Sequence, residues 1–171
     1  MNSLKKILVK RIVRKRIAAY ECSNLQEDKL QSMLILFDAE AAFSENFFTE
    51  LGSLANIPPG QTKWLGFSAK PRKKKVWKHP VFHNKHIAWD GTLKGDGVEA
   101  VLNRPYDLVI NFFDKPSWQL KAAASQVQTG LRLGFEEVNA DINDIVFKAD
   151  LKAEEVFKTE FCKYLKALRK L

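Results

Sequence analysis

Three histidines lie close together near the middle of the chain, where they could bind a metal ion. His79, His83 and His86 have the spacing H-x3-H-x2-H, and Asp90 follows them closely. Imidazole nitrogens and carboxylates are ligands that Zn²⁺ accepts. Seven Lys and Arg side chains lie between residues 70 and 85, however, and their positive potential disfavours a dication. We therefore expect no metal site and assign the imidazoles to ring stacking or phosphate contacts.

Acidic side chains follow two apolar runs, at the points where an α/β enzyme would have its active site. Asp38 and Glu40 follow the first run, and Asp114 follows the later one. Ligands of open parallel sheets bind at such strand ends, so a small Rossmann-like enzyme using Asp38 and Asp114 is one alternative. Neither G-x-G-x-x-G nor G-x-x-x-x-G-K-[ST] is present, and carboxylates at the first turn would repel a phosphate. We interpret Asp38 and Glu40 as helix-capping groups and Ser117 as the N-cap of the following helix. We predict no enzyme activity, no cofactor and no small-molecule substrate.

The two cysteines give no sign of a disulfide scaffold or a zinc ribbon. Cys22 and Cys162 are 140 residues apart and form no C-x-x-C pair. This usage fits a reducing compartment, so we expect a cytoplasmic protein. Cys162 follows Phe161 in the last helical pattern, and we expect it to pack in the core. A cysteine nucleophile paired with one of the histidines remains an alternative, but no local motif supports it.

The positive charge of the chain is concentrated in two segments. The 171 residues include 28 Lys and Arg and 20 Asp and Glu, for a formal net charge of +8. Residues 1–20 contain seven basic residues and no acidic one, whereas residues 61–95 contain nine basic residues and one acidic residue, Asp90. The other 116 residues carry 12 basic and 19 acidic side chains. A mildly acidic body with two basic segments indicates a polyanionic partner, either nucleic acid or an anionic membrane.

Both basic segments have the composition of an RNA-binding surface. Lys and Arg neutralise phosphates and release counterions. The aromatic residues of the second segment, Trp77, Phe82 and Trp89, could stack on unpaired bases. No RNP, KH or other sequence-reading module is recognisable, so we expect phosphate contacts to dominate. The predicted RNA-binding residues are Lys5, Lys6, Lys10, Arg11, Arg14, Lys15, Arg16, Lys70, Arg72, Lys73, Lys74, Lys75, Trp77, Lys78, His79, His83, Lys85 and His86.

Residues 3–21 lack Gly and Pro and are predicted to form a helix. On a helical wheel its apolar residues form two opposite stripes, and its cations lie all the way round. The stripes are Leu4, Leu8 and Ile12 on one side, and Val9, Val13, Ile17 and Tyr20 on the other. A helix on a membrane surface should segregate its charge, so a peripheral membrane protein is the less favoured alternative and we expect no membrane partner. Two further alternatives are an arm with solvated lysines and a transit peptide, although transit peptides usually contain more Ser and Arg.

Strand and helix patterns alternate along the rest of the chain. Continuous apolar runs predict buried strands, with shorter candidates between them, at residues 32–37, 62–68, 87–89, 107–113, 131–135 and 144–147. Helical patterns cover residues 42–55, 97–102, 118–128 and 151–168, and Gly130 is expected to stop the third of these. The alternation predicts an α/β fold, a three-layer Rossmann-like or flavodoxin-like sandwich with a mainly parallel sheet of about five strands. We expect a basic N-terminal helical arm at 1–21 and an α/β domain at 31–171, with a long basic loop inserted at about 70–95.

Several strand segments resemble an uncharacterised, lineage-restricted bacterial α/β family of about this length. The segments are Met33–Asp38 (MLILFD), Tyr106–Phe113 (YDLVINFF), Leu131–Phe135 (LRLGF) and Lys148–Leu151 (KADL), and the resemblance covers roughly residues 1–170. It implies an extra protein of the large ribosomal subunit. It carries over no catalytic residue, because the family has no catalytic motif.

Composition and resemblance together lead to one functional expectation. We expect an RNA-binding structural protein of the ribosome, in the large subunit, with a role in translation as part of a ribonucleoprotein. Its partners would be ribosomal RNA and neighbouring ribosomal proteins. The RNA would be contacted through the basic N-terminal helix and the basic aromatic loop.

Overall fold

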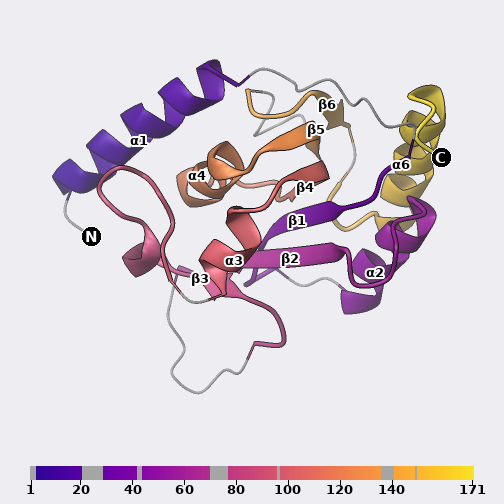
Figure 1. Ribbon diagram of the computed structural model, residues 1–171, viewed down its shortest axis with the longest axis horizontal. Helices are drawn as coiled ribbons and strands as arrows, with labels where there is room; N and C mark the ends of the chain where they lie inside the picture. The colour runs from indigo at the N-terminus through magenta and orange to yellow at the C-terminus, as the bar shows by residue number, and fades with distance from the viewer. Residues whose placement is uncertain are drawn as a thin grey trace.

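The continuous apolar runs of the sequence become strands of a single sheet. The computed structural model describes residues 3–20, 29–41, 44–69, 77–95, 97–135, 141–148 and 150–171. Within these residues, six strands form one sheet in the order β3-β2-β1-β4-β5-β6, and every pair of neighbours is parallel (Figure 1). The strands are β1 (Met33–Asp38), β2 (Thr62–Phe67), β3 (Val81–Phe82), β4 (Tyr106–Phe112), β5 (Thr129–Phe135) and β6 (Ile145–Phe147).

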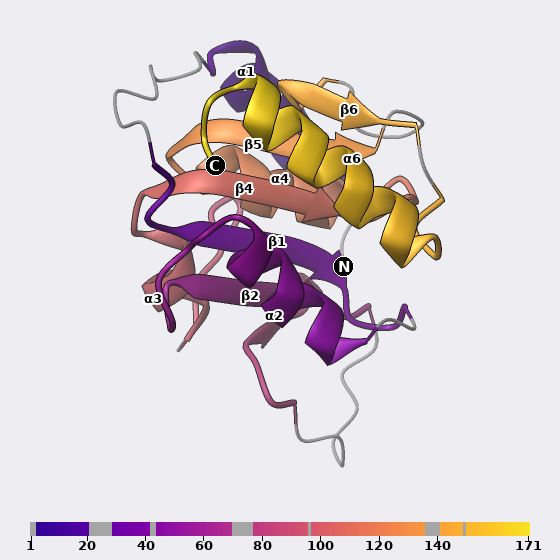
Figure 2. The same ribbon diagram turned by 90° about the vertical axis from the view of Figure 1, so that its right-hand side faces the viewer.

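Helices cover both faces of this sheet, so the predicted three-layer α/β sandwich is confirmed. On one face lie α2 (Glu45–Leu54) and α6 (Glu154–Ala167) (Figure 2). On the other face lie α1 (Ser3–Ala18), α3 (Val98–Leu102) and α4 (Trp118–Gln126). Because both faces are covered, the first five residues of β1 are all buried and its apolar run has no polar alternation.

The order of the strands reverses at the centre of the sheet. From β1 the chain adds β2 and β3 on one side, and from β4 it adds β5 and β6 on the other side. β1 therefore pairs with both β2 and β4, and Ile35 lies between Trp64 and Ile110. Such a reversal makes the crevice between the carboxyl ends of β1 and β4 the usual ligand position in this class of fold.

Two local predictions are wrong. Residues 87–89 form no strand of the sheet, because Ile87 makes only an isolated antiparallel bridge with Leu93. The sixth strand is instead β3, which lies inside the predicted loop and is held by hydrogen bonds from Gly66 N to Pro80 O and from Ser68 N to Phe82 O. Gly130 does not stop a helix either, since α4 ends at Gln126 and Gly130 lies within β5.

The predicted basic helix forms, and it packs on the body of the protein. Val9 and Val13 of α1 are buried in the same core as Leu120 of α4, and Ile17 packs against that core. Figure 1 shows α1 lying along the α4 side of the sheet. No helix in the described part of the chain is both long enough and apolar enough to span a bilayer.

Candidate nucleic-acid interface

The burial of Val9 and Val13 decides which side of α1 faces outward. These residues belong to one of the two apolar stripes of the helix, so the opposite side is left to solvent. RNA could therefore reach only the outer side of α1, although cations lie all the way round the helix. The cations on the exposed side are Lys6, Lys10, Arg11, Arg14 and Lys15.

None of these five exposed cations takes part in an ion pair with a described residue. The ion pairs of the described structure lie elsewhere, for example between Lys121 and Asp141 and between Lys163 and Glu160. The first turn of α1 contains no acidic residue, and Lys15 lies in its last turn, where a cation is favourable for the helix dipole. The outer side of α1 thus presents five cations that form no ion pair within the described part of the chain.

The remaining two predicted cations of α1 attach the helix to the loop after η1 (Asn84–His86). Arg16 Nη2 donates a 2.8 Å hydrogen bond to the carbonyl oxygen of Asp90. The Nζ atom of Lys5 lies 5.9 Å from the centre of the Trp89 ring. Gly91 lies beside α1 in this loop, and its φ of +76° is a left-handed conformation that favours glycine. Lys5 and Arg16 therefore position the helix as well as adding charge.

A groove between α1 and α4 continues the basic side of the helix. It has a volume of about 310 Å³, and its lining includes Lys10, Arg14 and Lys121. Trp118 forms part of its wall. Lys121 Nζ forms an ion pair with Asp141 Oδ1 at 2.6 Å. Asp141 is the one carboxylate in the described lining of the groove. The groove can therefore accept a phosphate next to an aromatic ring. Lys121 and Trp118 were not among the predicted RNA-binding residues, since no local pattern links them to a helix about a hundred residues earlier.

Much of the second basic segment lies outside the described residues. This applies to Lys70, Arg72, Lys73, Lys74 and Lys75. Lys78 and Lys85 are described and exposed. Two of the aromatic residues contribute to packing: Phe82 is fully buried in the core, so its expected stacking on bases is wrong, and Trp77 packs against the core of the α2 face. Trp89, by contrast, is 53% exposed and presents a ring to solvent.

The three histidines have separate surroundings. The His79 ring lies among aromatic rings, with its centroid 5.0 Å from that of Phe37 and 5.9 Å from that of Trp64. Both of its ring nitrogens are buried, so a phosphate in solution does not reach them. His83 Nδ1 lies 2.7 Å from the carbonyl oxygen of Ser68, and His83 N donates to His86 Nδ1. Burial, and then the charges of Lys85 and His83, lower the pKa of His86.

This arrangement assigns the histidines mainly to loop structure. The neutral form of His86 is favoured, and its Nδ1 atom is already occupied as an acceptor. Among the described residues, no group of three or more His, Cys, Asp or Glu side chains is placed to hold a metal ion. The Asp90 carboxylate is engaged by Thr92, whose side-chain and backbone hydrogen bonds lower its pKa.

The carboxylates of the alternative enzyme site meet at the strand-order reversal. Asp38 and Asp114 both line a cavity between β1 and β4, together with Lys115 and Ser117. Its volume is about 150 Å³, below the roughly 300–1,000 Å³ of typical small-molecule sites. Ser117 is the N-cap of α4, as predicted, and its Oγ accepts a hydrogen bond from Leu120 N at 3.2 Å.

The capping role predicted for Asp38 and Glu40 is wrong. α2 begins only at Glu45, after its N-cap Ser44, so neither carboxylate reaches the helix end. Asp38 instead accepts a 2.9 Å hydrogen bond from Glu40 N, and Glu40 accepts one of 2.7 Å from Ser68 Oγ.

The two cysteines are placed only in part. Cys162 is half-buried, so it is not fully packed in the core as expected, and Cys22 lies outside the described residues.

The fold and this surface define a doubly wound α/β protein with a basic helix packed on one layer. The chain belongs to the family of unknown function DUF6913, whose model matches residues 5–168. The match therefore includes α1 beyond its first residues as well as the whole sheet. Comparison with curated proteins and with solved structures finds no match.

Proposed function

We propose that this protein binds RNA through the outer side of α1 and the adjoining groove between α1 and α4. The observation that carries the proposal is the set of five exposed cations on α1 without a described ion-pair partner. Cations without an ion-pair partner on a helix that is packed against the domain can displace the counterions of a phosphate backbone. The exposed ring of Trp89 beside Lys5 adds a surface on which an unpaired base can stack.

We further propose that the RNA is ribosomal and that the protein is a structural component of the large subunit. Two features support this proposal. The strand segments resemble a family associated with that subunit, and the chain has a second basic segment at 61–95. Phosphate contacts from a rigid α/β body position a protein on folded RNA without reading sequence. The protein would act in the cytoplasm beside neighbouring ribosomal proteins, with no catalytic step of its own.

Fractionation of a cell lysate on sucrose gradients tests this proposal. The protein, detected by mass spectrometry, is expected in the large-subunit and 70S fractions at low salt and at the top of the gradient at high salt. A variant with Arg11, Arg14 and Lys15 changed to Gln should leave the ribosomal fractions at lower salt than the wild type. Its control changes Lys152, Lys166 and Arg169 to Gln, three exposed cations at the C-terminal end of the chain.

A second assay, vesicle flotation, distinguishes RNA from an anionic membrane as the partner. Leu4 and Ile7 are 61% and 64% exposed at the start of α1, and Leu8 is exposed beside them, so a lipid surface has a few apolar side chains to contact. Flotation with vesicles containing phosphatidylglycerol is expected to leave the protein in the unbound fraction. Binding to vesicles together with absence from the ribosomal fractions at low salt would contradict the proposal.

A further inference from the structure

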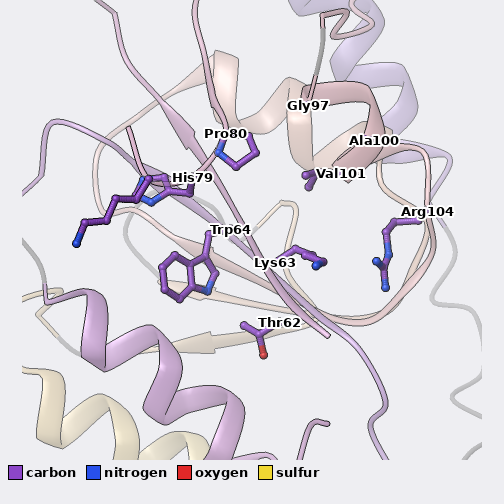
Figure 3. Close-up of a pocket in the computed structure, with 10 residues that line it drawn as sticks. Thr62, Lys63, Trp64, His79, Pro80, Gly97, Ala100, Val101 and Arg104 are labelled. Atoms are coloured by element: carbon purple, nitrogen blue, oxygen red, sulfur yellow. The ribbon is translucent and has the colours of Figure 1, made fainter. Parts of the chain in front are cut away.

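A second cavity lies at the β3 edge of the sheet, and none of its described lining residues belongs to α1. Its volume is about 500 Å³. Figure 3 shows the residues that line it. β3 pairs with β2 only at Gly66 and Phe67, so no described strand pairs with the first half of β2 on that side. The cavity lies beside this first half of β2. Its walls are Thr62–Trp64 of β2, residues 78–80 before β3, and α3 with Arg104.

The lining of this edge pocket is positively charged. Lys63, Lys78 and Arg104 contribute cations, and the ten described lining residues include no Asp or Glu. Figure 3 shows Lys63 between Trp64 and Arg104. The Arg104 guanidinium is oriented in advance, because it donates to Gln61 Oε1 at 2.9 Å and lies 5.0 Å from the centre of the Tyr106 ring. The pocket is therefore suited to a phosphate group.

The pocket also contains an aromatic ring and an unused hydrogen-bond donor. The Trp64 ring is fixed edge-on against Phe48 and His79, at centroid distances of 5.7 and 5.9 Å. Its Nε1 atom is buried and has no hydrogen-bond partner among the described residues. A buried N–H without an acceptor is unfavourable, so a ligand that displaces the groups covering Nε1 and supplies an acceptor atom would be stabilising.

The part of the β2 edge that no described strand covers offers further hydrogen-bonding groups beside this ring. Gly66 and Ser68 direct their N–H groups toward β3, where they donate to Pro80 and Phe82. Successive residues of a parallel strand point their backbone groups to alternate sides, so Thr62 and Trp64 face the same way. Donors and acceptors at this spacing next to an aromatic ring suit the polar edge of a nucleobase.

We propose that the edge pocket binds one unpaired nucleotide of an RNA strand, with its base beside Trp64 and the β2 edge and its phosphate on Lys63, Lys78 and Arg104. This inference rests on the proposed function, because it takes the nucleotide to be part of RNA. The pocket volume lies within the range of sites that enclose small ligands. An extended peptide could also pair with a strand edge, but a described lining with three cations and no Asp or Glu favours a phosphate.

Three RNA-type probes test the pocket: a single-stranded oligonucleotide, a duplex of equal length, and free adenosine 5′-monophosphate. A double variant, Lys63→Gln with Arg104→Gln, should bind the single strand roughly tenfold more weakly than the wild type. Its affinity for the duplex should match that of a control with Lys152→Gln and Arg169→Gln, which removes the same charge. The α1 variant should weaken binding of both RNA forms.

Two readouts do not depend on a destabilising substitution. In the wild type, adenosine 5′-monophosphate should shift the NMR signal of the Trp64 indole N–H, which is assigned by its loss in Trp64→Phe. A single strand containing 4-thiouridine should crosslink to the peptides around 62–64 or 78–80. Thermal melts of the variants establish that they are folded before affinities are compared.

The outcomes for the pocket and for the proposed function are distinguishable. RNA binding that depends on α1, with no indole shift and no effect of Lys63→Gln and Arg104→Gln, would overturn the pocket and leave the proposed function standing. An indole shift with the free nucleotide but no binding of any RNA would support a nucleotide pocket and contradict RNA as its source. A protein that binds none of the three probes contradicts both.

Discussion

Arg132 is a buried cation, and Tyr20 covers it. The Arg132 side chain is 1% exposed, and its guanidinium carbon lies 3.5 Å from the centre of the Tyr20 ring. Arg132 also donates to the carbonyl oxygen of Val127 at 3.0 Å. Tyr20 follows α1, so this contact joins the end of the helix to β5.

We expect Tyr20→Leu to lower the free energy of unfolding by about 2 kcal/mol, because a desolvated cation–π contact is lost. Tyr20→Phe is the matched control, since it keeps the ring and removes the hydroxyl group, which lies 3.3 Å from the Thr129 carbonyl oxygen and 3.5 Å from Asp144 Oδ2. Urea denaturation measures both. Equal destabilisation by the two substitutions would show that the ring contributes little.

Tyr106 makes the stability of the fold sensitive to alkaline pH. Burial raises the pKa of its hydroxyl to about 12, and this hydroxyl donates to the carbonyl oxygen of Val101 at 2.9 Å. The unfolded chain, with an ordinary pKa near 10, gives up this proton first. Stability contributed by neutral Tyr106 is therefore complete below about pH 10 and is lost progressively as the pH rises toward 12.

The corresponding variant is Tyr106→Phe. It should be less stable than the wild type at pH 8, because the wild type keeps the hydrogen bond from the neutral hydroxyl to Val101. The stability of the variant should fall less steeply between pH 10 and 12. Denaturant midpoints across this pH range provide the measurement. Parallel curves for the two proteins would contradict the assignment to Tyr106.

Single residues show why part of the site could not be predicted. Phe82 and His79 lie in a basic, proline-containing segment that suggested exposed rings, yet one is core and the other is packed between Phe37 and Trp64. Their burial depends on β3, a strand of two residues, which is too short for any periodicity to indicate. Trp89 lies in the loop between the bridged residues Ile87 and Leu93 and remains exposed.

Among the elements, α1 is the one on which both the packing of the core and the proposed function depend. Val9 and Val13 fill the core beside α4, whereas Ile7 on the same helix is 64% exposed. The sequence placed the two apolar stripes correctly, but it could not show which of them would be buried. That choice is made by α4 and the loop around Gly91, which are far away in the sequence.

Valine truncations on α1 test whether the helix is part of the domain. Val9→Ala and Val13→Ala should each destabilise the protein by about 1–3 kcal/mol, because each leaves a small cavity in the core. Ile7→Ala, the control on the exposed side of α1, should change stability by less than about 0.5 kcal/mol. If all three variants unfold at the wild-type denaturant concentration, α1 is an independent arm and its outer side is not rigidly presented.

For the whole molecule, the fold was largely predictable. β1 and β4 are continuous apolar runs because both faces of the sheet are covered, and their alternation with helices specifies parallel pairing. The groove formed with Lys121 and Trp118 was not predictable, since it exists only once α1 and α4 are packed together. Charge counts located the basic segments, while packing determines which of their side chains a partner can reach.

The salt dependence of RNA affinity tests the central claim most directly. If the exposed side of α1 and the basic segment at 61–95 neutralise about six phosphates, log K should fall against log salt with a slope of about −4 or steeper. Changing Arg11, Arg14 and Lys15 to Gln should make this slope shallower by about two, whereas changing Lys152, Lys166 and Arg169 should leave it unaltered. A wild-type slope near zero, or equal slopes for the two triple variants, would contradict RNA binding through the outer side of α1.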